Sequence, residues 1–424
     1  MNKPYPSEWN SFCLRDVVES RSSNVDKKSY DGDKIVQLCN YTDVYYNNRI
    51  TSSISFMIAT AKDKEIERFS LCLDDVIITK DSETPDDIAI PAYVSEELDN
   101  VVCGYHLTLL RPYKNKASGE YLAHLFRLPI IQHYFYILAN GITRFGLTAD
   151  AIANAPLVLP PLPEQQKIAK ILTSVDEVIE KTQAQTDKLK DLKTGMMQEL
   201  LTKGVGVDGK PHTEFKDSPV GRIPKGWEVR QFGEIFKSYK YGPRFSAKDY
   251  ALNGNVKTIR GTDLSSNGVI KYTQVPTAKL DEKLVDQNAL EDGDLVMITT
   301  ADCGATAVFE KQSIPYIASA YAIKLTPKAQ LNSKYINYFM QTRSALTQVE
   351  SFIRKGTVAN LPGSDVMSIV LALPSLNEQN KIVDILEQLD KEIALKSDSL
   401  ESKSRLKKAL MQDLLTGKVR VQVD

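Results

Sequence analysis

Few residues in this sequence have the types and spacing that catalysis requires. The segment Gly204–Lys210 approaches the spacing of a phosphate-binding loop. However, Pro211 stands where such a loop carries the Ser or Thr that binds magnesium, and a helical pattern rather than a strand precedes it. No metal-binding spacing occurs among the four histidines, which are His106, His124, His133 and His212. We therefore predict no catalytic residues and no metal ligands, and we interpret His106, which alternates with apolar neighbours, as a strand residue.

Chemistry of another kind is suggested by basic residues that lie beside Gly, Ser, Thr and aromatic residues in loop-like segments. Arg and Lys donate hydrogen bonds to phosphates and to base edges in DNA, and Thr contributes at either place. The candidate DNA-contacting residues are Arg21, Lys27, Lys28, Thr143 and Arg144 in the first half of the chain, and Lys240, Tyr241, Arg244, Lys248, Arg260, Arg354, Lys355 and Thr357 in the second half. For each of them the alternative interpretation is a loop side chain that only meets solvent.

Two of these segments occupy the same place in an internal repeat. Thr143 and Thr357 are separated by 214 residues, as are Leu147 and Leu361. Unrelated surface turns have little reason to recur at the offset of a repeat, so the equivalence favours both segments as contact loops. Arg144 and Lys355 do not align with each other. We therefore expect the two loops to share a position but not a base contact.

The repeat is clearest between Leu159–Val205 and the segment that lies 214 residues later. It holds there without a gap, with 19 identities in 47 positions. Trp9 and Trp227 stand near the starts of the two repeated halves. A repeat of this kind indicates a duplicated unit. We interpret each copy as a mixed domain followed by a helical segment.

Both helical segments have the pattern of one long helix. Apolar residues recur at steps of three and four, and Gly204 and Gly417 provide a stop signal after each segment. The 38 residues from Glu164 to Leu201 correspond to ~57 Å of helix. Such a helix has one apolar stripe that needs a partner, and the other copy is the natural one. The alternative is that each helix packs only on its own domain.

The sequence predicts an α+β fold, with two similar mixed α/β domains separated by two long helices. We expect these helices to lie antiparallel, because the tandem copies then acquire pseudo-two-fold symmetry. The domains contain short strand-like runs such as Lys34–Cys39 and Val76–Thr79, and each ends with a helical pattern, Gly119–Leu138 or Ser333–Phe352. We assign residues 1–157 to the first domain, 158–205 to the first helix, 206–220 to a linker, 221–371 to the second domain, and 372–424 to the second helix and a tail.

Composition limits the function classes. The 424 residues are 42% hydrophobic and 25% charged, which is typical of globular proteins. A net charge of −1 argues against a generally basic nucleic-acid coat, so any DNA binding must use local patches or a partner. The five scattered cysteines favour reduced thiols, and neither a membrane span nor a signal peptide is evident. We expect a cytoplasmic protein that does not contact membranes.

Four short motifs carry a resemblance to a known family. The helical segments open with Leu159-Pro-Pro-Leu-Pro-Glu-Gln and Leu373-Pro-Ser-Leu-Asn-Glu-Gln, and both close with Leu-Leu-Thr. The second half opens with Ile223-Pro-Lys-Gly-Trp-Glu-Val. Together these motifs resemble the specificity subunit of type I restriction–modification systems, across essentially the whole chain.

The resemblance implies a function and a set of partners. Two target-recognition domains would each read one half of a split site in double-stranded DNA, and the helices would hold them apart. Two methyltransferase (modification) subunits would join the chain, and motor–nuclease (restriction) subunits would complete the restriction enzyme. S-adenosylmethionine, ATP and Mg²⁺ would belong to those partners, with no cofactor in this chain.

Two other interpretations remain open at this point. One is a non-catalytic coiled-coil scaffold without DNA readout. The other is the recognition half of a self-contained restriction–methylation enzyme, which requires nuclease and methyltransferase motifs that we do not find in the sequence.

Overall fold

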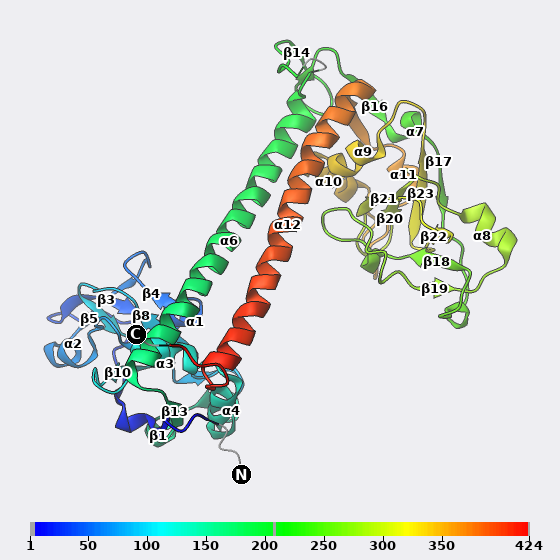
Figure 1. The fold of residues 1–424 in the computed structure, drawn as a ribbon. Helices are drawn as coiled ribbons and strands as arrows, with labels where there is room; N and C mark the ends of the chain where they lie inside the picture. The colour runs from blue at the N-terminus through cyan, green and yellow to red at the C-terminus, as the bar shows by residue number, and fades with distance from the viewer. Residues whose placement is uncertain (1–4, 207–208, 423–424) are drawn as a thin grey trace. The chain divides into compact units, whose positions relative to one another are not determined.

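The computed structural model describes residues 5–206 and 209–422, and the chain divides into two compact units (Figure 1). The first unit comprises Met1–Ala184 and Ser397–Asp424, and the second comprises Gln185–Lys396. The two long helices are α6 (Leu162–Lys203) and α12 (Leu376–Leu414). Each of them begins in one unit and ends in the other.

The first unit is a mixed domain in which short helices surround small sheets. Its strands are β1 (Asn10–Cys13), β2 (Val18–Ser22), β3 (Lys34–Cys39), β4 (Arg49–Ile50), β5 (Met57–Ala61), β6 (Val76–Thr79), β7 (Asp81–Ser82), β8 (Pro91–Val94), β9 (Val101–Cys103), β10 (Leu107–Pro112), β11 (Asn140–Gly141), β12 (Phe145–Gly146) and β13 (Pro156–Leu159). Its short helices are α1 (Tyr41–Tyr45), α2 (Asp63–Phe69), α3 (Gly119–Leu125), α4 (Pro129–Leu138) and α5 (Ala149–Ala153).

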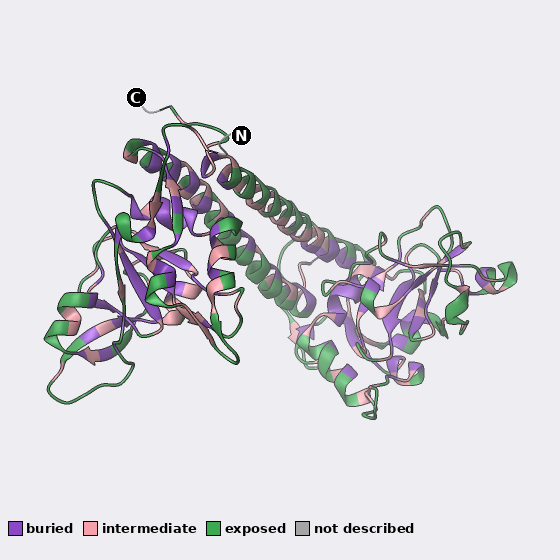
Figure 2. Cartoon of the chain, turned by 90° about the horizontal axis from the view of Figure 1, so that it is seen from below, coloured by how far each residue is buried: buried purple, intermediate pink, exposed green. Residues whose placement is uncertain are grey.

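The central sheet of the first unit has the strand order β2-β10-β6-β8-β4. All four residues of β6 are buried, because this strand lies in the middle of the sheet and is covered on both faces. Smaller sheets have the orders β5-β3-β9, β11-β12-β7 and β1-β13. The predicted strands Lys34–Cys39 and Val76–Thr79 are confirmed with the same bounds. Buried residues line the interior of each unit (Figure 2).

The second unit repeats this arrangement with variations. Its strands are β14 (Phe215–Lys216), β15 (Ile223–Pro224), β16 (Glu228–Gln231), β17 (Phe236–Tyr241), β18 (Val256–Ile259), β19 (Thr277–Ala278), β20 (Leu295–Ile298), β21 (Thr306–Val308), β22 (Tyr316–Ala318), β23 (Ala322–Pro327) and β24 (Val370–Leu373). Its short helices are α7 (Phe232–Ile235), α8 (Glu282–Asn288), α9 (Ser333–Met340), α10 (Arg343–Phe352) and α11 (Gly363–Val366). The main sheet has the order β17-β23-β20-β21.

The long helices pack against each other in opposite directions within the first unit. Asp176 of α6 pairs with Lys407 of α12 at 2.5 Å, and the Thr182 hydroxyl accepts a hydrogen bond from Lys403 Nζ at 3.1 Å. Residue numbers therefore rise along α6 where they fall along α12. Ile168 shares one hydrophobic core with Met411 and Leu414 of α12, together with the apolar residues of the domain.

The same direction holds within the second unit. Lys193 of α6 pairs with Asp390 of α12 at 2.6 Å, and Lys396 Nζ donates to Gln185 Oε1 at 2.8 Å. Leu200 and Leu201 share the core of this unit with residues from the start of α12. The predicted antiparallel pairing is thus confirmed in each unit, whereas the alternative that each helix packs only on its own domain is wrong.

A buried glutamate stands at the start of each long helix and receives the end of the other. In the first unit, Glu164 accepts two hydrogen bonds from Arg420, at 2.6 and 2.8 Å. In the second unit, Glu378 accepts hydrogen bonds from the Gly206 amide at 3.0 Å and from Trp227 Nε1 at 3.0 Å. The equivalent carboxylate in each unit therefore joins the start of one long helix to the chain that follows the other long helix. The hydrogen-bond donors differ between the two units.

Three details differ from the sequence-based expectations. Each closing helical pattern forms two helices, because Pro129 cannot continue α3 and Thr342 caps a new helix by accepting from the Ala345 amide at 3.3 Å. His106 is a turn residue with φ of +75°, not a strand residue. The linker assigned to 206–220 contains the short strand β14, and its residues 207–208 lie outside the described residues.

Candidate nucleic-acid interface

The first candidate loop is the tip of a β-hairpin. β11 pairs with β12, and β12 pairs in turn with β7. This pairing leaves Thr143 and Arg144 exposed between the two hairpin strands. The Leu147 amide donates to the Lys80 carbonyl at 2.8 Å, immediately after β6. The hairpin is therefore fixed to the end of the central strand of its sheet.

The second candidate loop is fixed at the corresponding place. Arg354 and Asn360 exchange two backbone hydrogen bonds, at 2.9 and 3.2 Å, and Lys355 and Thr357 are exposed between them. The Leu361 amide donates to the Thr299 carbonyl at 2.8 Å, immediately after β20. The two loops, which are 214 residues apart in sequence, thus have the same anchor in their respective units.

Arg144 lies against a carboxylate that the sequence analysis did not identify. Its Nη2 donates to Asp81 Oδ1 at 2.8 Å, and His106 Nδ1 lies 2.6 Å from Asp81 Oδ2. The Arg144 side chain is 58% exposed, whereas that of Asp81 is 15% exposed. The result is a basic side chain that reaches solvent from a partly buried, charged support.

An aromatic helix lies beside this support. Burial, followed by the charge of Asp87, raises the pKa of Tyr41 in α1 to about 12, and the charges of Asp81 and Arg144 act on the same hydroxyl. The Tyr41 ring stacks on that of Tyr45, with centroids 5.5 Å apart. Aromatic rings and the charged support thus lie near each other in the first unit.

The two lysines predicted in the first unit are exposed. The charge of Lys27 acts on Asp43 of α1, so Lys27 lies near the aromatic helix. Lys28 follows it in the same loop, where the Lys28 amide donates to Asp26 Oδ1 at 3.2 Å.

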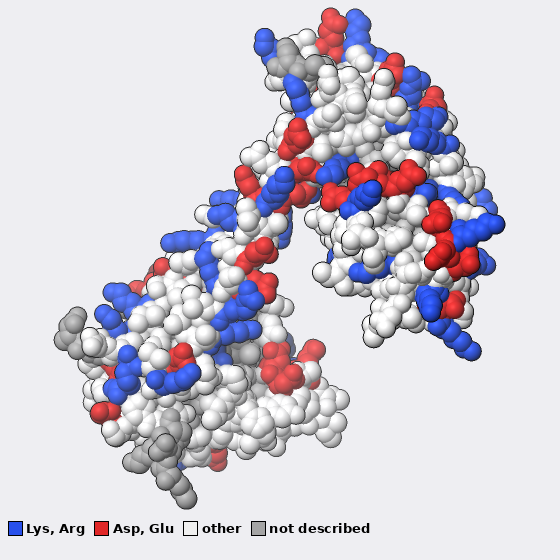
Figure 3. Space-filling view, turned by 45° about the vertical axis from the view of Figure 1, so that its right-hand side comes forward, with Lys and Arg blue, Asp and Glu red and all other residues white. Residues whose placement is uncertain are grey.

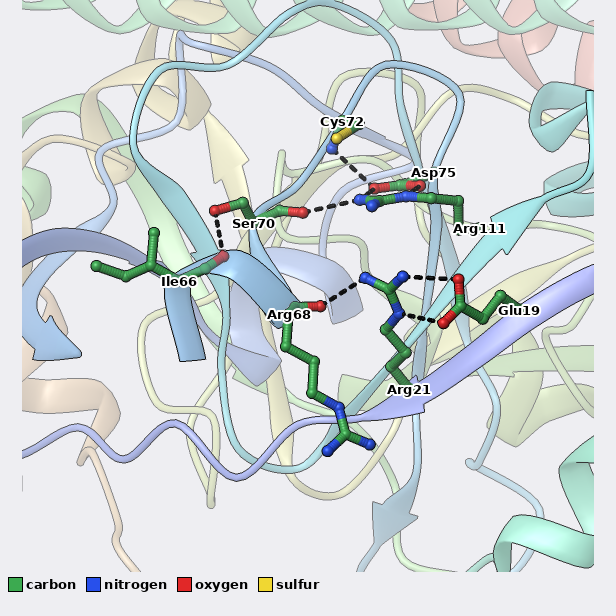
Figure 4. A network of polar contacts seen from close by, with 8 residues as sticks. All are labelled: Glu19, Arg21, Ile66, Arg68, Ser70, Cys72, Asp75 and Arg111. Atoms are coloured by element: carbon green, nitrogen blue, oxygen red, sulfur yellow. Dashed lines mark hydrogen bonds and ion pairs between the residues drawn. The ribbon is translucent and has the colours of Figure 1, made fainter. Parts of the chain in front are cut away.

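Arg21 and Lys240 are strand residues and not loop residues, which corrects our prediction. Arg21 lies in β2, and its Nη1 donates to the Arg68 carbonyl at 2.8 Å while Glu19 binds the rest of its guanidinium (Figure 4). Lys240 lies in β17, and its Nζ donates to the Gln287 carbonyl at 2.6 Å. Both carbonyls belong to the last turn of a helix, α2 or α8, where they lack helical partners and the helix dipole favours a cation. These two cations cap helices.

Two further candidates in the second unit are also bound within the fold. Arg260 donates to Asp263 from Nε at 3.1 Å and from Nη2 at 3.0 Å, and this hydrogen bonding raises the Arg260 pKa above its ordinary value. Tyr241, predicted in a loop, lies in β17, and its hydroxyl accepts from the Gly363 amide at 2.8 Å. Their side chains hold local structure together.

The remaining candidates of the second unit are exposed. Arg244 lies in the loop after β17, and Lys248 lies in a short 3-10 helix that Ser246 caps. The rings of Phe245 and Tyr250 flank this segment, with centroids 5.3 Å apart. Arg354 Nη2 lies 3.5 Å from Asp365, and its side chain is 73% exposed. These positions keep their charge at the surface.

The charge on the surface is mixed. In the view of Figure 3, Lys and Arg alternate with Asp and Glu along the long helices and do not form a single basic face. Among residues 5–206 and 209–422, no cluster of three or more His, Cys, Asp or Glu could hold a metal ion. Within the same ranges, no helix is long and apolar enough to cross a membrane.

Comparison with protein families gives a match over most of the chain. The family model of the type I restriction modification DNA specificity domain matches residues 6–191 and again residues 224–402. The putative type I restriction enzyme MjaX specificity subunit of Methanocaldococcus jannaschii is 27% identical over 424 residues, which cover 98% of this chain and 95% of that protein. The EcoKI specificity subunit of Escherichia coli is 22% identical over 290 residues, which cover 66% of this chain and 60% of that protein.

Solved structures show the same fold. The S subunit of a type I restriction–modification system from M. genitalium aligns with a TM-score of 0.59 at 14% identity, over 98% of this chain and 97% of that chain. A chain from a study of complex assembly and conformational transition in the type I R-M system aligns with a TM-score of 0.53 at 19% identity, over 98% and 99% of the two chains.

Proposed function

The chain belongs to the family of type I restriction–modification DNA specificity proteins, and on this premise we propose that it is the DNA-recognition subunit of such a complex. Each unit contributes a target-recognition domain that reads one half of a bipartite site. The observation that carries the proposal is the pair of basic, exposed loops fixed to equivalent strands, through Leu147 in one unit and Leu361 in the other. A scaffold without DNA readout gives no reason for exposed basic side chains on both loops.

For the domains we propose the boundaries expected from the sequence. Residues 1–157 and 221–371 form the recognition domains, 158–205 and 372–424 contain the conserved helices, and 206–220 join the halves. The two loops differ in their basic residues, because Arg144 has a carboxylate support and Lys355 does not occupy the aligned position. The two half-sites should therefore differ in sequence.

The long helices bind the methyltransferase subunits. Leu192 of α6 and Leu406 of α12 are related by the repeat offset, and both are about half exposed, at 50% and 55%. Exposed apolar residues at equivalent positions of two helices suit two copies of one partner. Motor–nuclease subunits complete the complex on DNA in the cytoplasm, and S-adenosylmethionine, ATP and Mg²⁺ serve those partner subunits. The chain itself is non-catalytic.

The proposal is tested by reconstitution with the cognate methyltransferase. Methylation should occur only when both proteins are present, and sequencing of the methylated DNA should show one motif with two specified halves and an unspecified spacer. Replacing Leu192 and Leu406 together by Glu should abolish the association while a matched variant of the exposed Lys203 leaves it intact. Methylation that is independent of this chain would contradict the proposal.

A further inference from the structure

The hydrogen positions at Asp81 follow from its contacts. His106 Nδ1 lies 2.6 Å from Asp81 Oδ2, so this nitrogen carries a hydrogen and donates it. Arg144 Nη2 also lies 3.2 Å from His106 Nδ1, but two donors cannot bond each other. The carboxylate therefore accepts one hydrogen bond on each oxygen, from Arg144 and from His106. Because the Asp81 side chain is only 15% exposed and holds both Arg144 and His106, Asp81 acts as a support for Arg144.

The guanidinium of Arg144 keeps a two-donor edge available. Asp81 takes one of the two hydrogens on Nη2. The other Nη2 hydrogen pairs with Nε–H or with an Nη1 hydrogen, and either pair forms two parallel donors. Within the described part of the chain, neither Nε nor Nη1 of Arg144 has a hydrogen-bond partner. Two parallel donors match O6 and N7 of guanine in the major groove, which is the commonest specific contact of Arg with DNA.

The backbone around this site is fixed at close quarters. A Cβ at Gly141 would lie 1.8 Å from the Arg144 carbonyl oxygen, so the hairpin needs glycine there. Asp81 belongs to β7, which pairs directly with β12 beside Arg144. His106 has φ of +75°, a conformation that is strained for non-glycine residues and is concentrated at functional sites. Three segments distant in sequence are thus held around one guanidinium.

We propose that Arg144, positioned by Asp81 and His106, reads a guanine in the half-site contacted by the first unit. The inference rests on the proposed function and adds the base class and two positioning residues to it. The second unit has no counterpart, because the turn residue equivalent to His106 is Tyr321 and the residue aligned with Arg144 is Val358. A guanine read in this way should therefore occur in one half-site only.

The competing assignment is a phosphate contact by Arg144. A phosphate contact depends on charge, tolerates lysine, and loses affinity to a similar degree on every sequence. A guanine contact depends on the planar fork, so Arg144→Lys should fail although it keeps the charge. The two assignments also differ on the DNA side, because replacement of guanine by 7-deazaguanine removes only the N7 acceptor.

The experiment uses the complex of this chain with its methyltransferase and the duplex motif determined by sequencing of methylated DNA. Affinity is measured for wild type, Arg144→Lys, Asp81→Asn and the exposed control Arg15→Lys, on duplexes with 7-deazaguanine at each guanine in turn. At one guanine the wild-type affinity should fall about 5- to 150-fold. On the natural duplex, Arg144→Lys should bind more weakly than wild type by a similar factor. Its affinity should fall little further on the duplex with 7-deazaguanine at that position. Asp81→Asn should weaken the same contact, and Arg15→Lys should behave as wild type.

Several outcomes would overturn the inference. The first is a half-site that contains no guanine. The second is an Arg144→Lys variant whose affinity falls on the 7-deazaguanine duplexes by the same factors as that of wild type. If wild type discriminates its motif from scrambled DNA in these cases, only the role of Arg144 is wrong. If wild type shows no such discrimination, the proposed function itself fails.

Discussion

Basic residues of the same type serve different purposes in this chain, according to what already binds their charge. Arg21 and Lys240 donate to carbonyls at helix ends, whereas Arg144 presents most of its guanidinium to solvent from a carboxylate support. In the sequence, neither the residue type nor the neighbouring glycines distinguish a basic residue that caps a helix from one that faces solvent. Asp81 and His106 were missed because their meeting depends on strand pairing between segments 25 residues apart. The repeat offset, in contrast, was sufficient to locate both loops.

Replacing Arg21 by Ala should lower the free energy of unfolding of the first unit by about 1–3 kcal/mol, since charge-assisted hydrogen bonds to Glu19 and the end of α2 are lost. Urea denaturation followed by Trp9 fluorescence, in a Trp227→Phe background, measures this. Lys34→Ala, which removes an exposed ion pair with Asp63, is the matched control and should change little. An Arg21→Ala variant with wild-type stability and weakened DNA binding would contradict the capping role.

A buried histidine should make the stability of the first unit depend on pH. Burial, with the charges of Lys407 and Arg127, lowers the pKa of His124 to about 3. The unfolded state therefore binds a proton below pH ~6.5 that the folded state excludes, and stability falls as pH decreases from 6.5 toward 3. At pH 5 the loss from this group is about 2 kcal/mol.

The repeat supplies the variant that tests this dependence. Tyr338 occupies the equivalent position in the second unit, where its hydroxyl donates to Asp390 at 2.7 Å. His124→Tyr should therefore keep the packing and remove this part of the pH dependence between pH 7 and 5. The free energy of unfolding is measured by denaturation at several pH values. If it changes with pH by the same amount in wild type and variant, His124 does not titrate on unfolding.

Among the secondary-structure elements, the local sequence predicted the strands better than the points at which a helical pattern divides into two helices. The runs Lys34–Cys39 and Val76–Thr79 are β-branched and apolar between turn signals, and they form strands with those bounds. The pattern from Ser333 to Phe352 is periodic throughout, yet Thr342 starts a second helix. Thr342 caps this helix by accepting from the Ala345 amide, and hydrophobic periodicity does not show such a cap.

The two Lys–Asp pairs between the long helices should fix their register. Lys193 is only 10% exposed, so Lys193→Met leaves Asp390 without its charged partner and should cost about 3–5 kcal/mol in the second unit. Exchanging the two residues, with Lys193→Asp and Asp390→Lys, should recover part of the loss. Lys203→Met, which removes an exposed pair with Glu199, is the control and should cost under about 1 kcal/mol. Equal stabilities of the two Met variants, measured by urea denaturation, would rule out the register role.

The length of the helices should set the spacer between half-sites. Inserting seven residues after Ala184 and seven after Lys396 preserves the pairs within each unit, because both points lie at the boundary of the units. The insertion adds ~10.5 Å with only ~20° of rotation, which corresponds to roughly three base pairs. Sequencing of DNA methylated by the variant should show the same half-sites with a longer spacer. An unchanged spacer with full activity would exclude this role for the helices.

At the scale of the whole molecule, each unit contains one recognition domain and parts of both long helices. The start of α6 and the end of α12 share a core with the first domain, and the end of α6 and the start of α12 share one with the second. The gapless repeat predicted this exchange of helix ends, since an antiparallel pair brings the end of one copy to the start of the other. The duplicated loops within these units support the central claim that two separate readers lie on one chain.

That claim is tested most directly by exchanging residues 18–155 for the corresponding segment of another family member. The exchange keeps the β1–β13 pairing and the contacts of Glu8 and Glu164 with Arg420, so the helix junction stays native. The methylated motif of the chimera, made with the cognate methyltransferase, is then determined by sequencing. We predict that one half of the motif changes while the other half and the spacer stay as in wild type. A motif in which both halves change, or neither does, would contradict the account.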